Sequence, residues 1–86
     1  MMFEIDWTAK AQKQLAKIGT AKDRQVIFRE VGKLCDFPSC RNIKPLTDHA
    51  HGYRLRVGHY RILFDVDTDV RIIAIQEVKK RDEHTY

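Results

Sequence analysis

Three arginines stand close together in a segment, 52–64, that predicts a β-hairpin: Arg54, Arg56 and Arg61. The turn is expected at Gly58-His59, because glycine accepts the positive φ of the first central position in a type II′ turn. Such a turn places Arg56 directly opposite Arg61, where like charges destabilise a sheet by up to about 1 kcal/mol. The two predicted strands contain no acidic residue to offset them. The pattern indicates either a place for an external anion or a solvated basic face.

An anion held by several guanidinium groups suits the chemistry of a phosphodiester. Guanidiniums bind phosphate oxygens through paired hydrogen bonds and stabilise the charge that develops in phosphoryl transfer. The last residues of the chain follow the strand expected beside this hairpin, so we expect them to bring Arg81, His84 and Tyr86 to the arginines. A histidine can move a proton near neutral pH, and a tyrosine can stack on an unpaired base.

These residues suit attack by an RNA 2′-hydroxyl on the adjacent phosphate, a reaction that needs positioning, charge stabilisation, a base and an acid. Binding of nucleic acid or of an acidic protein without catalysis fits the same residues. The structural alternative for Arg61 and Arg81 is an ion pair with Asp65 or Asp82. The alternatives for the tail histidine and tyrosine are an exposed side chain and a frayed chain end.

The composition indicates a small basic protein. With 86 residues the chain predicts one domain, 1–86, with a modest core and a shallow groove as its site. The formal charge of +4 favours a polyanionic partner. Charged residues interrupt the first twenty positions and no apolar run reaches membrane-spanning length, so we expect a cytoplasmic protein without a membrane partner. Cys35 and Cys40 are expected to be free thiols, and the four histidines form no recognisable metal-ligand set, so neither metal nor cofactor is expected.

The remaining elements are predicted from their apolar spacing and end signals. The expected order is a strand from Phe3 to Trp7, a helix from Thr8 to Gly19, a helix from Thr20 to near Phe37, an edge strand from Ile43 to Leu46, the hairpin, and a strand from Val70 to Val78. A short connection between the helices makes them antiparallel neighbours. The chain therefore predicts an α+β domain in which two N-terminal helices pack on an antiparallel sheet of about four strands.

The alternation of the hairpin predicts which of its side chains are buried. Side chains on a strand point alternately to the two faces of the sheet. The face expected in the core carries Tyr53, Leu55, Val57, Tyr60, Ile62 and Phe64. The strand that begins at Val70 is apolar on both faces, and the turn before it is ambiguous by one residue, so its faces cannot be assigned from register.

Two motifs of this chain resemble the RelE/ParE toxin superfamily, and most of all its RelE branch. They are Tyr-Arg-Leu-Arg-Val-Gly-His-Tyr-Arg at 53–61 and Glu-Val-Lys-Lys-Arg-Asp at 77–82 with a closing Tyr86. The likeness extends over nearly the whole chain. It implies a microbial-RNase-like α+β fold and the toxin half of a bacterial toxin–antitoxin pair. RelE-type toxins cleave mRNA in the ribosomal A site, leave a 2′,3′-cyclic phosphate, need no metal, and are neutralised by a small antitoxin that wraps around them.

The resemblance also implies roles for individual residues. Arg54 and Arg56 stand where the RelE pattern has two lysines, and Arg61 matches the arginine that follows the second aromatic of the hairpin. Arg81 matches the phosphate-stabilising arginine that is the proposed general acid. Tyr86 matches the tyrosine that stacks on the target base, although its spacing from Arg81 differs by one. The lysines expected to bind RNA are Lys44, Lys79 and Lys80.

Arg56 departs from the RelE pattern in a way that affects the mechanism. The lysine at this position is the proposed general base of the family, but an arginine does not lose its proton in proteins. The identity of the general base is therefore not determined, and the candidates are His84, Glu77 and a ribosomal group. The expected partners are an antitoxin, the 30S A site of the ribosome and mRNA. The alternatives are a ParE-like inhibitor of DNA gyrase without hydrolytic activity and a small basic RNA-binding module.

Overall fold

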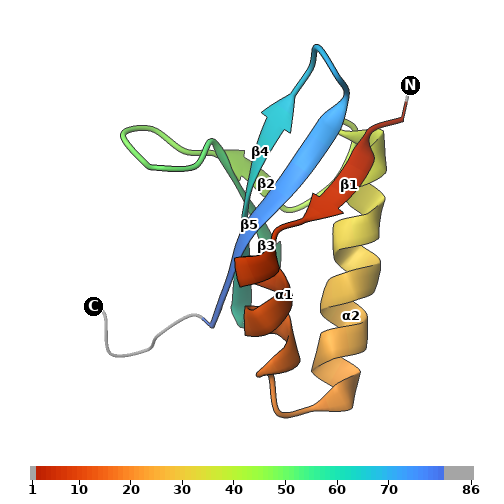
Figure 1. Cartoon of the computed structure of the whole chain (residues 1–86), viewed down its shortest axis with the longest axis vertical. Helices are drawn as coiled ribbons and strands as arrows, with labels where there is room; N and C mark the ends of the chain where they lie inside the picture. Colours follow the sequence, from red (N-terminus) through yellow and green to blue (C-terminus); the bar gives the residue numbers. More distant parts are fainter. Residues whose placement is uncertain (1, 81–86) are drawn as a thin grey trace.

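The computed structural model describes residues 2–80, in which two helices pack on one face of a five-stranded sheet (Figure 1). In chain order the elements are β1 (Glu4–Trp7), α1 (Ala9–Ala16), α2 (Ala21–Gly32), the 3₁₀ helix η1 (Lys33–Asp36), β2 (Ile43–Pro45), β3 (Tyr53–Val57), β4 (Tyr60–Asp67) and β5 (Ile72–Lys80). The predicted α+β class with two N-terminal antiparallel helices is confirmed. Within the described range, no helix has the length and apolar character needed to cross a membrane.

The two helices begin and end close to their predicted limits. Thr8 caps α1, because its hydroxyl oxygen accepts a hydrogen bond from the N–H of Ala11 at 3.2 Å. The α-helical part of α2 ends at Gly32, and η1 continues the chain to Asp36. The predicted end near Phe37 therefore includes a last turn that is 3₁₀ rather than α-helical.

The sheet has one strand more than the approximate four expected. Its order is β1-β5-β4-β3-β2, in which β2 to β5 form an antiparallel meander and β1 joins β5 in parallel. The parallel pair aligns Glu4 with Ile72. Local alternation predicted β1 as a strand, but pairing between opposite ends of the chain is a tertiary property that no local pattern contains.

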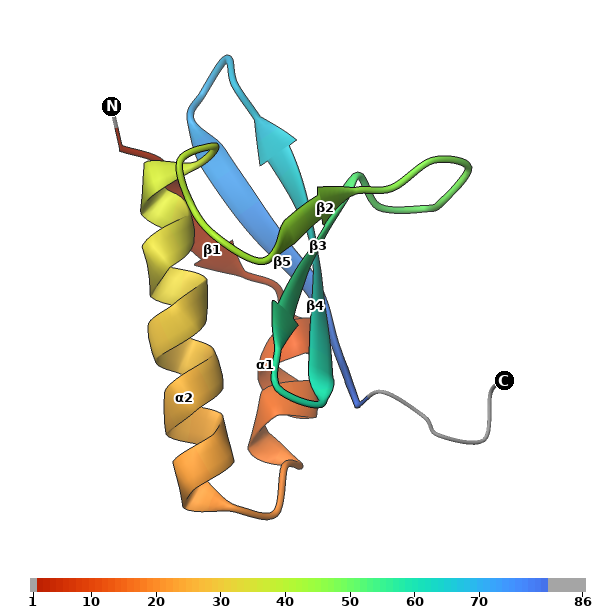
Figure 2. The same cartoon turned by 180° about the vertical axis from the view of Figure 1, so that it is seen from behind.

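The hairpin register agrees with the prediction residue by residue. Val57 lies opposite Tyr60, and Arg56 lies opposite Arg61. Gly58 has a φ of 56°, the left-handed conformation that a first turn position requires here. The turn lies beside the N-terminal half of α2 (Figure 2), where Tyr60 Oη donates a hydrogen bond to Asp23 Oδ2 at 3.2 Å.

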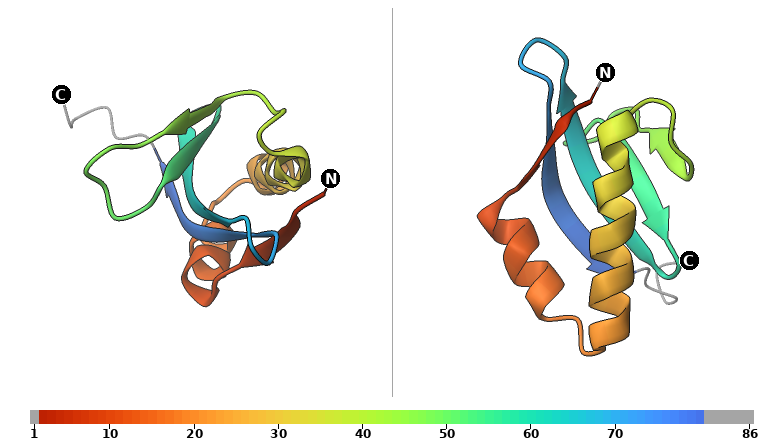
Figure 3. Two further views of the ribbon diagram at one scale, coloured as in Figure 1. Left: turned by 90° about the horizontal axis from the view of Figure 1, so that it is seen from above. Right: turned by 90° about the vertical axis from the view of Figure 1, so that its right-hand side faces the viewer.

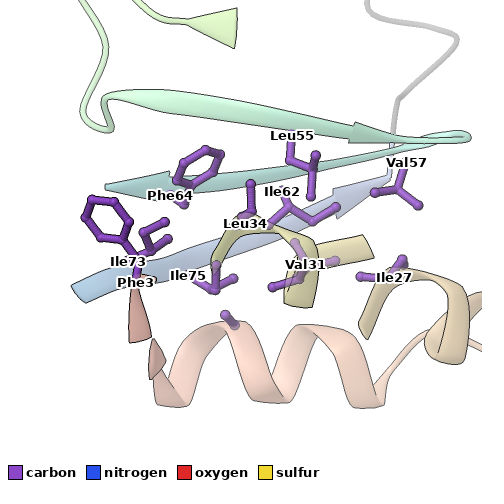
Figure 4. Packing of buried hydrophobic residues seen from close by; sticks show 12 residues of the cluster. Phe3, Ile27, Val31, Leu34, Leu55, Val57, Ile62, Phe64, Ile73 and Ile75 are labelled. Carbon is purple, nitrogen blue, oxygen red and sulfur yellow. The ribbon is translucent and has the colours of Figure 1, made fainter. Parts of the chain in front are cut away.

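The core lies between the helices and the sheet (Figure 4). Of the hairpin face predicted to be apolar, four residues are buried, and Tyr53 and Tyr60 are half-buried against them. The buried hairpin residues are Leu55, Val57, Ile62 and Phe64. They pack with Ile27 and Val31 of α2 and with Ile73 and Ile75 of β5. The opposite face of the hairpin therefore looks away from the helices.

A β-bulge between β4 and β5 explains why the last strand could not be assigned to faces from its sequence. Leu63 pairs with Glu77, but the next residue, Phe64, pairs with Ile75, so Gln76 has no partner opposite it. The extra residue lets Ile75 and Val78 both reach the core. It leaves Glu77 on the outer face beside Leu63.

Candidate functional site

Four strands contribute positive charges to the sheet face that is turned away from the helices. The register places Lys44 opposite Arg54, Arg56 opposite Arg61, and Arg61 opposite Lys79. Directly opposed residues share a face of the sheet. We call this group the basic face, and its members are Lys44, Arg54, Arg56, Arg61 and Lys79.

A hollow of about 300 Å³ opens at the hairpin end of the basic face. Its lining residues are Lys44, Leu46, Arg54, Arg56, Gly58, Tyr60 and Arg61. Four of these are cations, supplied by β2, β3 and β4. Guanidinium groups bind phosphate oxygens in a fixed fork geometry, so the hollow is suited to an anion such as a phosphate group on a nucleic-acid chain.

The structure brings together most, but not all, of the predicted site residues. Five of them form the basic face: Lys44, Arg54, Arg56, Arg61 and Lys79. Lys80 lies opposite Tyr60, whose side chain points toward α2, so the backbone of β5 directs Lys80 to the helix side of the sheet. Three predicted residues, Arg81, His84 and Tyr86, lie outside the described residues, and their place beside the basic face stays a prediction.

The like-charge pair of Arg56 and Arg61 should lower the stability of the protein. We expect Arg56→Thr to raise the free energy of unfolding by a few tenths to about 1 kcal/mol, because it removes the repulsion and threonine suits a strand. Urea unfolding monitored by circular dichroism measures the change. A loss of stability of more than about 1 kcal/mol would show that Arg56 has a structural role instead.

Tyr60 is not suited to act as a base at this site. Burial raises the pKa of Tyr60, and the hydrogen bond to Asp23 raises it further. The phenol therefore keeps its proton at neutral pH. Its hydroxyl fixes the hairpin turn to α2 rather than serving the hollow.

A second cluster of charged groups adjoins the basic face, and His51 lies at its centre. Its Nδ1 is 3.0 Å from Asp65 Oδ2 and its Nε2 is 3.3 Å from Glu77 Oε2. Asp65 Oδ1 also accepts a hydrogen bond from the N–H of Gly52 at 2.7 Å. Glu77 Oε1 is 3.3 Å from Lys10 Nζ and 3.6 Å from Lys79 Nζ. Asp65, considered above as a partner of Arg61, thus binds His51 and the loop backbone.

The surroundings of Glu77 keep it ionised. Burial raises the pKa of Glu77, but the hydrogen bond from Lys10 and the charges of Lys79, Lys10 and His51 together outweigh this effect and lower it below its ordinary value of 4.5. A carboxylate with a lowered pKa is a weak proton acceptor at neutral pH. Glu77 is therefore better suited to hold charged neighbours in place than to serve as the general base.

The lowered pKa predicts how stability depends on pH. A group whose pKa is lower in the folded protein stabilises the fold above its unfolded value, and this contribution is lost as the pH falls through the folded value. We expect Glu77→Gln to be about 1–2 kcal/mol less stable than the wild type at neutral pH. This difference should shrink below pH 4.5, the ordinary value of the group.

Thermal or urea unfolding of both proteins across this pH range measures the difference. Glu4→Gln is the matched control, because Glu4 is an exposed glutamate of β1 away from the cluster. We expect the control to show no comparable loss at neutral pH. Equal effects of the two substitutions at every pH would contradict a specific role for Glu77.

Sequence reasoning did not single out His51 as a site residue. Asp65 follows Leu63 by two positions in β4, so strand alternation predicts that its side chain points to the outer face. The position of Glu77 depends on the bulge, and His51 lies in a loop without periodicity. The three groups meet only when the loop folds back over β4 and β5.

Comparison with known proteins gives the same fold and names the family. Residues 5–84 match the family described as the ParE toxin of the type II toxin–antitoxin system parDE. No curated protein sequence matches the chain. A chain of the RelBE2 toxin–antitoxin complex from Mycobacterium tuberculosis is 25% identical with a TM-score of 0.82, over 94% of this chain and 100% of that one.

Two further solved structures share the fold at lower identity. A chain of the archaeal RelE–RelB complex from Pyrococcus horikoshii is 20% identical with a TM-score of 0.79, over 96% of this chain and 99% of that chain. The isolated RelE toxin of E. coli is 16% identical with a TM-score of 0.78, over 96% and 88% of the two chains. The chain therefore belongs to the ParE toxin family of type II toxin–antitoxin systems, within the RelE/ParE superfamily.

Proposed function

We propose that this toxin is a ribosome-dependent endonuclease that cleaves mRNA in the A site. The observation that carries the proposal is the pair Arg56 and Arg61, held directly opposite each other in a hollow lined by four cations. Two guanidinium groups that face each other on the open side of a sheet can bind the oxygens of one phosphodiester. The fold shared with RelE toxins supports the same activity.

In the proposed reaction the RNA supplies its own nucleophile. The 2′-hydroxyl oxygen attacks the adjacent phosphorus while the bond from phosphorus to the 5′ oxygen breaks, which gives a 2′,3′-cyclic phosphate and a 5′-hydroxyl. The proton of the 2′-hydroxyl passes to a base and the 5′ oxygen receives a proton from an acid. Arg54, Arg56 and Arg61 stabilise the charge on the phosphate oxygens as it increases.

Residues 81–86 are part of the proposed site by their resemblance to the RelE pattern. By its match to the RelE pattern, Arg81 stabilises the charge on the phosphate, and Tyr86 stacks on the target base. His84 is a candidate for proton transfer. Lys44 and Lys79 of the basic face bind flanking phosphates of the RNA. The reaction takes place in the cytoplasm, where ribosomes translate.

The proposed regulator is a small antitoxin protein. Several solved structures of similar fold are toxin–antitoxin complexes, from M. tuberculosis, P. horikoshii and Methanococcus jannaschii among others. A partner with acidic segments complements the basic face of this toxin. Expression of the toxin without the antitoxin should arrest growth, and co-expression should restore it.

A second candidate is inhibition of DNA gyrase without hydrolysis. It is favoured by the family match, because the matched family is described by the ParE toxin. A gyrase inhibitor needs neither a cationic hollow nor the residue types of Arg81 and Tyr86, which makes it the weaker candidate. A basic module that binds RNA without cleaving it is the third possible outcome.

Primer extension on mRNA from cells expressing the toxin separates the three functions. We expect in-frame cuts within coding sequence that disappear with Arg81→Ala. Supercoiling defects and DNA damage with intact mRNA would show gyrase inhibition. RNA binding without mRNA cuts and without DNA damage would show that the protein is an RNA-binding module.

A further inference from the structure

The loop that joins β2 to β3, residues 46–52, lies on the side of the sheet away from the helices (Figure 3). Leu46, at its start, lines the hollow, and the N–H of Leu46 donates a hydrogen bond to the Gly52 carbonyl oxygen at 2.8 Å. At its end, His51 and Gly52 bind Asp65. The loop therefore contributes Leu46 to the wall of the hollow, and it is closed at its base and held to the sheet by its histidine.

His51 lies close to the arginines on the outer face of the sheet. It bridges Asp65 of β4 and Glu77 of β5, and Leu63 lies between these two anchors, directly opposite Glu77. Leu63 is 4% exposed, although it belongs to the outer face rather than to the core cluster. It also lies opposite Arg54 and two residues from Arg61. The imidazole is thus about one side-chain row away from the basic face.

Whether His51 can keep both of its contacts depends on whether its imidazole ring is charged or neutral. A charged imidazole has an N–H on each ring nitrogen, so it can donate a hydrogen bond to both carboxylates at once. A neutral ring has one N–H, and one of the two carboxylates then loses its donor. A histidine changes between these states within about pH 5 to 8.

The charged groups around His51 come from three elements. Asp65 of β4 and Glu77 of β5 contact the ring. Lys10 of α1 and Lys79 of β5 bind the other oxygen of Glu77. Within the loop, the exposed His49 has its ring centre 6.1 Å from that of His51. These lysines bind Glu77, whereas Asp65 is bound by His51 and by the Gly52 amide.

We propose that His51 is a positioning residue of the hollow, whose charged form closes the 46–52 loop onto β4 and β5 and strengthens the binding of an RNA phosphate. Loss of the proton weakens binding in two ways. It loosens the wall that carries Leu46, and it removes a positive charge beside Arg54 and Arg61. The inference deepens the proposed function, on which it rests for the identity of the ligand.

Binding of a non-cleavable RNA tests the proposal. The probe is a fully 2′-O-methylated RNA hexanucleotide, titrated by fluorescence anisotropy at constant ionic strength between about pH 6 and pH 8. For the wild-type toxin we expect the dissociation constant to rise about fivefold over this range. This is the size expected when one unit charge, about one side-chain row from the bound phosphate, is lost near a protein surface.

Two substitutions at the same position separate charge from structure. His51→Gln should bind at the lower pH about as weakly as the wild type does at the higher pH, so most of the pH dependence should be lost. His51→Arg keeps a permanent charge and two donor groups, so it should bind tightly at both. His59→Gln is the matched control, since it removes an exposed histidine of the hairpin turn and should keep the wild-type pH dependence. Unchanged pH dependence in His51→Gln would overturn the proposal.

NMR of the toxin without RNA distinguishes failure of this inference from failure of the proposed function. The amide signals of Leu46 and Gly52 should shift with the same midpoint as the His51 ring in the wild type and should stay constant in His51→Arg. If they do so while the RNA probe never binds, the loop closes as inferred but the hollow by itself does not bind RNA, and the primer extension described above then decides the proposed function. If RNA binds and these signals do not follow the ring, the positioning role is wrong.

Discussion

Replacing Arg56 by threonine should lower the rate of ribosome-dependent mRNA cleavage by about 100-fold or more, because one well-placed donor to a developing oxyanion contributes about that much. Arg56 is exposed, lines the hollow and lies directly opposite Arg61, so its removal takes a cation from the site without opening the core. The rate is measured by primer extension in a reconstituted translation system. The same variant is expected to be slightly more stable, which would separate lost function from lost fold.

Two further variants make this prediction decisive. Arg29→Ala is the matched control, because Arg29 is 68% exposed on α2, on the helix side of the sheet, and should leave cleavage unchanged. Arg56→Lys keeps the charge and restores the residue type of the RelE pattern, so it should retain at least about a tenth of the wild-type rate. Full cleavage by Arg56→Thr would show that the hollow does not hold the reacting phosphate.

The largest expected effect on stability is at Phe64. Phe64→Ala should lower the free energy of unfolding by about 3–5 kcal/mol, because truncation of a buried phenylalanine leaves a cavity that the fold cannot fill. Its side chain is fully buried, stacks on Tyr53 with ring centres 5.5 Å apart, and meets the edge of Phe37 at 6.1 Å. Urea or thermal unfolding measures the loss.

Phe28 provides the control for this prediction. It is 62% exposed on α2 and contacts the Trp7 ring at 6.0 Å, so Phe28→Ala should lower the free energy of unfolding by about 1 kcal/mol or less. Similar losses for the two phenylalanines would contradict the position of the core. Because small domains have little stability in reserve, Phe64→Ala is also expected to reduce the amount of folded toxin in cells.

Much of the site can be derived from the sequence because it lies in one hairpin. A two-residue turn around Gly58 fixes the register, and register fixes which side chains share a face. The opposition of Arg56 and Arg61 and the apolar face that packs on the helices follow from that turn alone. The cap of α1 at Thr8 is likewise a local property, since it involves an N–H only three residues away.

The rest depends on contacts between residues far apart in the chain. The parallel pairing of β1 with β5 and the bulge at Gln76 are set by how the whole sheet packs against the helices. The bulge turns Glu77 outward, and the β2–β3 loop then brings His51 to it across Leu63. The sequence by itself therefore determined the arginine pair, because local backbone geometry dictates it. The tertiary structure decided which charged groups surround that pair, because only folding brings those strands and the loop together.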